Sequence, residues 1–437
     1  TSGASFTWTR AAVVGISNAA ITSPQTANPN EILVNTNANP IDVAYIYTIT
    51  ANGCSNTQAI TVQVNPTPQL NSTLAPAAIC SNSAFTYTPS SLTSGATFTW
   101  TRTAVSGISN PAVTTAQSNN PNETLINTTN NPVDVIYAYT TSANGCTNTQ
   151  SVRVTVNPTP TLSSTLTPTA ICSNSAFTYS PASATSGATF TWTRAAVTGI
   201  TNTDVSTPQS ANPNEILVNA TANPIDVVYA YTIAANGCNN TQNVRVRVNP
   251  TPILATTLTP PAICSNSAFT YTPSSNTTGA SITWTRASVP GISNPAITTP
   301  QSSNPNETLV NITANPIAVV YVYTLTANGC SNTQNVIVTV NPSPSLNSAT
   351  SLEICSDDNL IYTASSATVG TSFSWTRTAV AGISNAAANG TGDIINETLI
   401  NTTADAIDVV YVFTLTANGC SSIQNVTVTV KPSPTLS

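Results

Sequence analysis

The sequence predicts an all-β protein, built as a tandem array of small β-sandwich domains that form an extended rod. It repeats itself at a period of about 92 residues, because a Trp-Thr-Arg triplet and an Asn-Gly-Cys triplet each recur five times. Within each repeat, apolar and polar residues alternate as in half-buried strands, and no stretch shows helical periodicity. A repeat of this length matches one two-layer sandwich and is too long for a solenoid coil.

Proline-rich segments separate the repeats. Asn65-Pro66-Thr67-Pro68 is the first of them, and prolines two apart favour a stiff, extended connector that leaves neighbouring domains in contact. The predicted units are residues 1–64, a partial repeat without its N-terminal part, then 65–156, 157–248, 249–340, a divergent and more acidic 341–430, and 431–437, a linker to a further repeat.

The second repeat shows the expected strands in order. Alternating segments at 85–88 and 97–102 precede an irregular stretch at 107–122, which is followed by strands at 123–127, 133–140 and 152–156. An Asn-Gly turn joins the last two strands, which is a strong hairpin signal. A tryptophan on the core face after the first long loop is typical of a seven-strand immunoglobulin-like sandwich. The predicted core tryptophans are Trp8, Trp100, Trp192, Trp284 and Trp375.

Several motifs resemble those of a known family. Ile-Cys-Ser-Asn-Ser-Ala-Phe-Thr-Tyr, the Trp-Thr-Arg strand, Asn-Pro-Asn-Glu, Tyr-x-Tyr-Thr and Ala-Asn-Gly-Cys together resemble the PKD-like repeats of large Bacteroidota surface proteins, over the whole chain. Such proteins are typically exported by the type IX secretion system, and some are adhesins of gliding motility. The resemblance therefore implies an extracellular, cell-surface adhesin and brings no catalytic residues.

Composition excludes several function classes. Charged residues make up 5% of the chain and the net charge is −6, which disfavours nucleic acid as a partner. The chain has no histidine, and its few carboxylates have no base partner, so we expect neither an enzyme nor a bound cofactor. No apolar run approaches the roughly 18–20 residues that cross a bilayer, so we expect no membrane span in this sequence.

Nine regularly spaced cysteines, without the close pairs of a zinc site, indicate disulfides and an oxidising location. Two pairing schemes remain open, because the first cysteine of each unit is placed only to within several residues. Pairing within units joins Cys80–Cys146, Cys172–Cys238, Cys264–Cys330 and Cys355–Cys420, with the partner of Cys54 outside this sequence. Pairing between successive units joins Cys80–Cys238, Cys172–Cys330 and Cys264–Cys420, with the partners of Cys54, Cys146 and Cys355 outside it.

The second scheme follows from sandwich topology. The first interstrand loop and the last hairpin turn lie at opposite poles of such a domain. A strand of about seven residues separates these poles by roughly 23 Å, whereas a disulfide needs Cα atoms within about 7 Å. In a head-to-tail array, one pole of each unit faces the opposite pole of the next.

An arginine follows each tryptophan, and a glutamate recurs later in each unit, as in Arg102 and Glu123. One interpretation is a carbohydrate or carboxylate site beside an aromatic platform. The other, which the inward-facing tryptophan favours, is a structural ion pair at the rim of the sandwich, worth about 0–1 kcal/mol if it is exposed. Tyr137 and Tyr139 are expected in the core.

The last unit concentrates acidic residues, among them Asp357, Asp358 and Asp393. Clustered carboxylates are what calcium prefers, so these three are the candidate metal ligands. The unit lacks an Asp-x-Asp-x-Asp-Gly loop, however, and solvation of an acidic surface explains the residues equally well. Calcium therefore remains the alternative to a chain without a cofactor.

These observations predict a structural stalk or filament segment of a large bacterial cell-surface adhesin, acting in gliding motility or surface attachment. One alternative is a multivalent carbohydrate-binding array, for instance along the outward threonines Thr97, Thr99 and Thr101. Another is a set of accessory modules of a secreted polysaccharide hydrolase. The expected partners are neighbouring repeats of the same chain, together with surface glycans or other cell-surface proteins.

Overall fold

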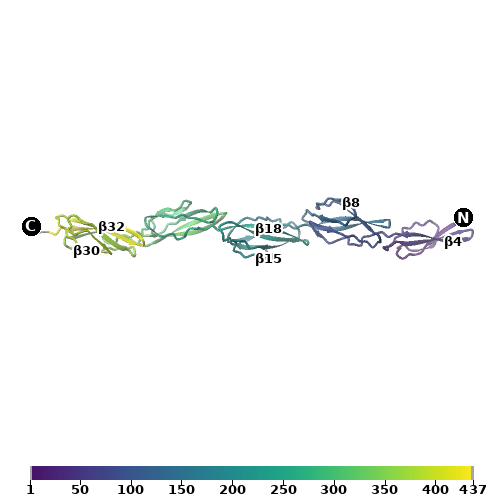
Figure 1. The fold of residues 1–437 in the computed structure, drawn as a ribbon, viewed down its shortest axis with the longest axis horizontal. Coiled ribbons are helices and arrows are strands. Elements are labelled where there is room, and N and C mark those ends of the chain that lie inside the picture. The colour runs from purple at the N-terminus through teal and green to yellow at the C-terminus, as the bar shows by residue number, and fades with distance from the viewer. Residues whose placement is uncertain (1, 435–437) are drawn as a thin grey trace.

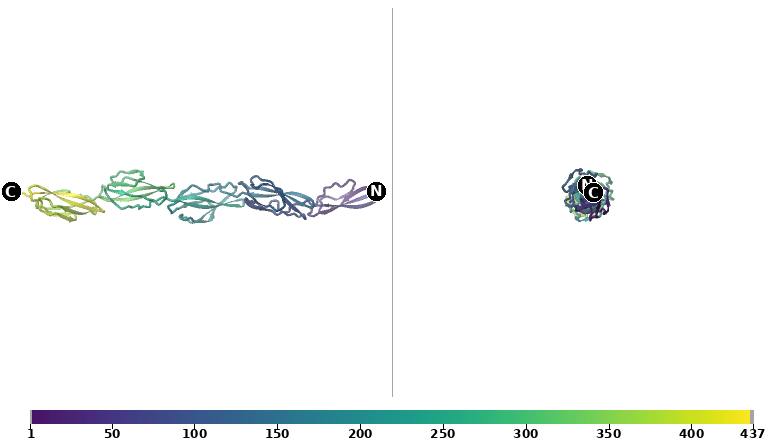
Figure 2. Two further views of the ribbon diagram at one scale, coloured as in Figure 1. Left: turned by 45° about the horizontal axis from the view of Figure 1, so that its top comes forward. Right: turned by 90° about the vertical axis from the view of Figure 1, so that its right-hand side faces the viewer.

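The computed structural model describes residues 2–434, which form a straight rod of five domains joined end to end (Figure 1). Viewed down the rod, the domains superpose on one axis and both ends of the chain lie near it (Figure 2). All regular elements in residues 2–434 are β-strands. The predicted all-β array of immunoglobulin-like sandwiches is therefore confirmed.

The third domain shows the architecture of a complete unit. Its larger sheet has the strand order β12-β18-β17-β14-β15, in which β12 runs parallel to β18 and the other pairs are antiparallel. A two-stranded antiparallel sheet, β13-β16, covers it to give seven strands in two layers. The strand bounds are β12 Ile171–Cys172, β13 Ser175–Thr178, β14 Thr189–Arg194, β15 Val205–Gln209, β16 Asn214–Leu217, β17 Ile225–Ala235 and β18 Cys238–Asn249.

The second and fourth domains repeat this order. The second domain contains β5 Ile79–Cys80, β6 Ser83–Thr86, β7 Thr97–Arg102, β8 Val113–Gln117, β9 Asn122–Leu125, β10 Val133–Ala143 and β11 Cys146–Asn157. The fourth contains β19 Ile263–Cys264, β20 Ser267–Thr270, β21 Ser281–Arg286, β22 Ile297–Gln301, β23 Asn306–Leu309, β24 Ile317–Ala327 and β25 Cys330–Asn341.

The two end domains vary this plan. The fifth keeps all seven strands, which are β26 Ser351–Cys355, β27 Asn359–Thr363, β28 Ser372–Arg377, β29 Ala388–Thr391, β30 Ile394–Thr398, β31 Ile407–Ala417 and β32 Cys420–Lys431. The first has one four-stranded sheet, made of β1 Ser5–Arg10, β2 Ile21–Gln25, β3 Ile41–Ala51 and β4 Cys54–Val64. Without a second layer in its described residues, Val62 is 43% exposed, whereas its equivalent Val154 is fully buried.

The strands differ from the sequence-based expectation in two places. The stretch at 107–122, expected to be irregular, contains strand β8, an exposed edge strand whose sequence, Val-Thr-Thr-Ala-Gln, has no apolar alternation to reveal it. The final hairpin is longer than predicted, because β11 begins directly after the turn and runs to Asn157. Its turn residues Asn144 and Gly145 both have positive φ, 52° and 75°, as a type I′ turn requires.

Each domain encloses its own core around the recurring tryptophan. All five tryptophans are buried, as the alternation predicts. In the third domain the Trp192 ring packs edge-on against Tyr229, with ring centroids 5.2 Å apart, and Phe177 covers the same tyrosine from the other layer at 4.8 Å. Because each core lies within one domain, the contacts between domains are available for a role other than folding of the domain.

Candidate functional site

Disulfides connect successive domains across their junctions. The structure contains Cys80–Cys238, Cys172–Cys330 and Cys264–Cys420, with Cα–Cα distances of 5.7, 5.7 and 5.6 Å. Pairing within units is therefore wrong, and Cys146 and Cys355 are not bonded to Cys80 and Cys420. Within residues 2–434, Cys54 and Cys355 are exposed free thiols and Cys146 is a half-buried one.

Strand topology explains why the cysteines of one domain do not meet. Cys172 ends β12 and pairs with Asn249 at the end of β18, while Cys238 begins β18. The 12 residues of that strand place the two cysteines at opposite poles, roughly 36 Å apart. The next domain instead presents Cys330, which follows directly after its Asn-Gly turn, to the pole that carries Cys172.

A repeated hydrogen bond reinforces each junction beside the disulfide position. Asn157 is 8% exposed, and its side-chain amide donates to the backbone carbonyl of Asn236 at 2.7 Å. Asn236 is the left-handed residue of the turn between β17 and β18, with φ of 51°. The same bond, at 2.8 Å, joins Asn65 to Asn144, Asn249 to Asn328, and Asn341 to Asn418.

The proline linkers are packed into the junctions. Both prolines of each four-residue linker that joins two of the five domains are buried, as in Pro158 and Pro160. In the next linker the Thr251 hydroxyl lies 3.5 Å from the Ser173 carbonyl of the preceding domain. A connector fixed on both faces is not a free hinge, and neighbouring domains touch end to end as the linker composition predicts.

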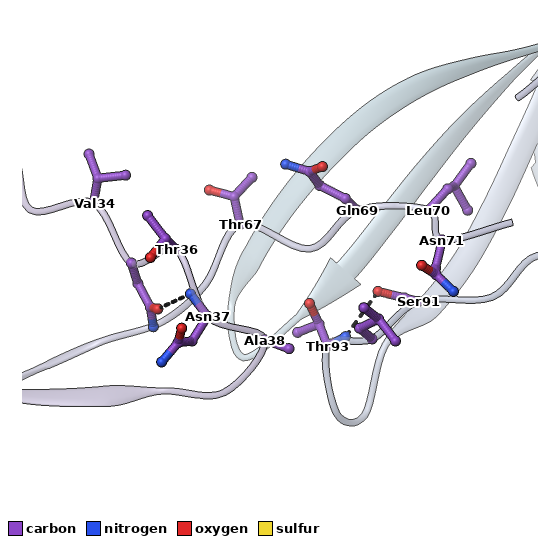
Figure 3. Close-up of a pocket in the computed structure, with 12 residues that line it drawn as sticks. Val34, Thr36, Asn37, Ala38, Thr67, Gln69, Leu70, Asn71, Ser91 and Thr93 are labelled. Carbon is purple, nitrogen blue, oxygen red and sulfur yellow. Dashed lines mark hydrogen bonds between the residues drawn. The ribbon is translucent and has the colours of Figure 1, made fainter. Parts of the chain in front are cut away.

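A polar groove lies between neighbouring domains (Figure 3). Between the first and second domains it has a volume of about 510 Å³, and between the third and fourth an equivalent groove has about 390 Å³. Across the latter junction the Thr278 hydroxyl donates to the Asn223 side chain at 2.8 Å. The larger groove has no charged side chain in its lining, which comprises Val34, Asn35, Thr36, Asn37, Ala38, Thr67, Gln69, Leu70, Asn71, Ser91, Leu92 and Thr93.

The recurring arginine and glutamate form a structural ion pair, as predicted, but the arginine is buried and does not lie at the rim of the sandwich. In the third domain the Arg194 side chain is 1% exposed and donates Nε–H to Glu215 Oε2 and Nη2–H to Glu215 Oε1, both at 2.9 Å. Trp192 and Arg194 are two residues apart on β14 and thus share its inward face. Strict alternation from the tryptophan was the signal for this burial.

Backbone groups and a tyrosine complete the cluster. Arg194 also donates to the carbonyls of Ala195 and Thr203, and the Tyr229 hydroxyl donates to Glu215 Oε2 at 2.7 Å. Burial alone raises the pKa of the Glu215 carboxyl, but the hydrogen bonds from Arg194 and Tyr229 lower it below its usual value. The equivalent ion pairs are Arg10–Glu31, Arg102–Glu123, Arg286–Glu307 and Arg377–Glu397.

This cluster stabilises the fold, because its charged groups bond to one another and to the backbone of the same domain. Four of the five guanidinium N–H groups of Arg194 donate to protein acceptors. Trp192, the supposed sugar platform, is 6% exposed, and its Nε1–H donates to the Ala211 carbonyl at 2.7 Å. Burial also raises the pKa of Tyr229, with a further contribution from its hydrogen bond to Glu215, so the phenol remains a neutral donor.

The candidate metal ligands lie in two separate turns. Asp357 and Asp358 connect β26 to β27, and Asp358 Oδ2 accepts the Cys355 backbone N–H at 3.2 Å. Asp393 lies between β29 and β30. No group of three metal-ligating side chains occurs among residues 2–434. In the same range, no helix has the length and apolarity to cross a membrane.

A buried asparagine was missed by sequence reasoning. The Asn219 amide donates to the carbonyls of Val248 and Asn223, at 2.9 and 2.8 Å, and its Oδ1 accepts the Thr221 N–H at 2.9 Å. It thereby fixes the loop that forms one wall of the junction groove. The available signal was recurrence at one position of every unit, as Asn35, Asn127, Asn219, Asn311 and Asn401.

Comparison with solved structures returns arrays of immunoglobulin domains and cadherin repeats. Three immunoglobulin domains of titin are 11% identical, with 63% of this chain and 99% of that one covered and a TM-score of 0.32. Four domains of Drosophila N-cadherin are 11% identical, with 82% and 100% covered and a TM-score of 0.24. The Down Syndrome Cell Adhesion Molecule is 10% identical, with 99% and 69% covered and a TM-score of 0.33.

No curated protein matches this sequence significantly. The model of the PKD-like domain family matches the chain five times, at residues 1–68, 77–160, 169–252, 261–344 and 352–434. These matches cover most of the chain and follow the five domains of the structure. The chain belongs to the PKD-like domain family and consists of five tandem copies of that domain.

Proposed function

We propose that this array is the stalk of a large bacterial cell-surface adhesin, which holds an adhesive tip away from the cell in surface attachment or gliding. The observation that carries the proposal is the junction: from the second domain to the fifth, a disulfide, an asparagine side chain and a packed proline linker fix each domain to the next. A fixed junction maintains length and direction, which a spacer needs and a flexible binding array does not.

Disulfides between domains support an extracellular location, because such bonds persist in oxidising environments. The proposed stalk is not an enzyme and uses no cofactor. This part of the proposal is supported by the Arg–Glu–Tyr clusters, whose charged groups are hydrogen-bonded within the domain, and by the chemistry of a chain without histidine. Attachment to the cell surface and export by type IX secretion rest on the resemblance to Bacteroidota repeats.

The junction groove supports a second candidate function, that of a multivalent array that binds neutral glycans. Amides and hydroxyls line the groove without charged side chains, and they match the donors and acceptors of a sugar. Equivalent grooves recur along the rod, so weak sites would gain affinity from avidity. The test below separates this candidate from the stalk.

The decisive experiment deletes residues 157–340 from the gene in the source cell. This removes two whole domains and leaves Cys80 able to pair with Cys420, so the shortened rod keeps a regular junction. A stalk predicts surface filaments shortened by two domains, of about 40 Å each, with the tip's ligand still bound. Loss of ligand binding in proportion to the lost junctions, together with glycan binding by the purified array, would overturn the stalk.

The threonine face of β7 lies outside the junction groove and needs a separate test. The purified chain and its Thr97→Ala/Thr99→Ala/Thr101→Ala variant are presented to the same panel of neutral glycans. We expect neither protein to bind, because these threonines lie opposite β10 in the sheet and outside the junction groove. Binding that the triple substitution abolishes would identify the threonine face as a site.

A further inference from the structure

We infer that the disulfides join the domains into a covalent cord, which consists of two parallel paths through backbone segments and disulfides, here called lines. The cord transmits tension along the array, and unfolding of the domains cannot lengthen it. The inference deepens the proposed stalk by specifying its mechanics, and it depends on the connectivity of three disulfides. It holds for the isolated chain whatever the tip binds.

The first line passes through alternate disulfides. From Cys80 it crosses to Cys238, follows β18 and the next linker into the fourth domain, and reaches Cys264 at the end of β19. There it crosses again, to Cys420 in the fifth domain. Between Cys238 and Cys264 the line therefore spans the third and fourth domains with only about 26 residues.

The second line uses the strands that the first one omits. It runs from Cys146 along β11 and the linker to Cys172, crosses to Cys330, and follows β25 and the next linker to Cys355. In every domain it crosses, each line uses either the last strand or the short first strand of the large sheet. The remaining five strands of each domain form loops between the two lines and lie outside the shortest path.

Hydrogen bonds hold the two lines side by side. In the third domain β12 of the second line pairs in parallel with β18 of the first, with Ile171 opposite Val248. Upstream of that pair, the Arg245 N–H donates to the Leu166 carbonyl at 2.8 Å. The fourth domain repeats the arrangement with the lines exchanged, because β19 there belongs to the first line and β25 to the second.

Chain length shows how little this cord can stretch. Fully extended, about 26 residues reach at most roughly 86–94 Å. The two folded domains that they span measure about 80 Å, from roughly 40 Å for each. Complete unfolding would thus lengthen this segment by about a tenth. A domain of about 92 residues without such disulfides would instead extend from roughly 40 to about 320 Å.

The test is single-molecule stretching of the full chain, held by peptide tags at its two ends, with Cys54, Cys146 and Cys355 replaced by serine in every protein. The shortest covalent path then contains residues 1–80, 238–264 and 420–437, which extend to about 430 Å. The first domain lacks a disulfide, unfolds freely and provides most of the lengthening. After reduction, the whole chain should extend to about 1,500 Å, a 3.5-fold increase.

Two matched variants make the test specific. Cys172→Ser/Cys330→Ser removes a disulfide from the second line only, so the fully extended length should remain about 430 Å. Cys80→Ser/Cys238→Ser interrupts the first line and should roughly double that length, to about 890 Å. Since extended length depends only on which cysteines are bonded, it is informative even where a variant folds less well.

Three results would overturn the inference. An oxidised chain that extends to about 1,500 Å has no disulfides between its domains. One that extends to about 1,050 Å has its disulfides within domains, because only Cys172–Cys238 and Cys264–Cys330 could then form. Equal lengthening by the two double substitutions would show that no alternation of lines exists.

Discussion

The most direct test of the fold is the substitution Glu215→Gln in the third domain. Glu215 accepts two hydrogen bonds from Arg194, both at 2.9 Å, and one from Tyr229 at 2.7 Å. Glutamine replaces one acceptor oxygen with an NH₂ group, which then faces donors, and removes the charge that balances a guanidinium whose side chain is 1% exposed. Breaking a buried ion pair in this way costs about 3–5 kcal/mol.

A matched control lies on the surface of the same domain. Asp226 pairs with Arg245 at 3.5 Å, and the two side chains are 42% and 60% exposed. Asp226→Asn changes the charge as Glu215→Gln does but leaves no buried charge, so it should cost about 0–1 kcal/mol. The comparison separates the effect of burial from the effect of removing one carboxylate.

Hydrogen exchange followed by peptide mass spectrometry measures each domain separately within the intact rod. A loss of 3–5 kcal/mol should accelerate exchange of the slowest amides of β14 and β17 by about 140- to 3,700-fold, since 1.4 kcal/mol is tenfold. The second domain should be unchanged because its core is separate. Similar, small effects of Glu215→Gln and Asp226→Asn on exchange would refute the reasoning that this buried ion pair stabilises the third domain.

Three further predictions use the same repeat. Tyr231→Phe should leave stability unchanged or raise it by up to about 1 kcal/mol, because the Tyr231 hydroxyl is buried without a partner. Phe413 occupies the same position in the last domain. Hydrogen-exchange measurements would show the effect, and a loss of stability above about 1 kcal/mol would contradict the prediction. Acid should destabilise the domains, because the pKa of Glu215 is lower in the folded state than in the unfolded state. Its contribution to folding stability is therefore complete above about pH 4.3 and is progressively lost as pH falls through the folded-state pKa. Urea titrations from pH 7 to 3 should show a constant free energy of unfolding down to about pH 5 and a decline below about pH 4. Gly199→Ala should cost more than Gly187→Ala in thermal melts, because both have positive φ but only the first would place a Cβ 2.6 Å from two side-chain methyl groups.

Sequence patterns predict the strands that bury one face and fail for those that do not. The inward residues of β10 follow strict alternation, so the strand and its core face can be read directly. The edge strand β8 is exposed along most of its length and therefore carries no such pattern. The strand forms because it pairs with β7 at Trp100 and Arg102. This pairing cannot be inferred from local composition.

The two pairing schemes show where sequence reasoning stops. Spacing indicates disulfides, and topology places the two cysteines of a unit at opposite poles, but the choice depends on which residue of β5 reaches Asn157. That register is a tertiary property, because β5 contains only Ile79 and Cys80. The burial of Arg102 was missed for a different reason, since a charged residue is expected at the surface unless it is paired.

A disulfide within each domain would have been the simpler route to stability. Closing a loop of about 66 residues inside one unit, as between Cys172 and Cys238, would add roughly 4 kcal/mol on entropic grounds. The structure instead places those cysteines at opposite poles and bonds them to different neighbours. The isolated domain must therefore be held by its apolar core and its buried Arg–Glu–Tyr cluster, and the disulfides act on the array. What they stabilise is the connection between domains, which matters when the load acts along the rod.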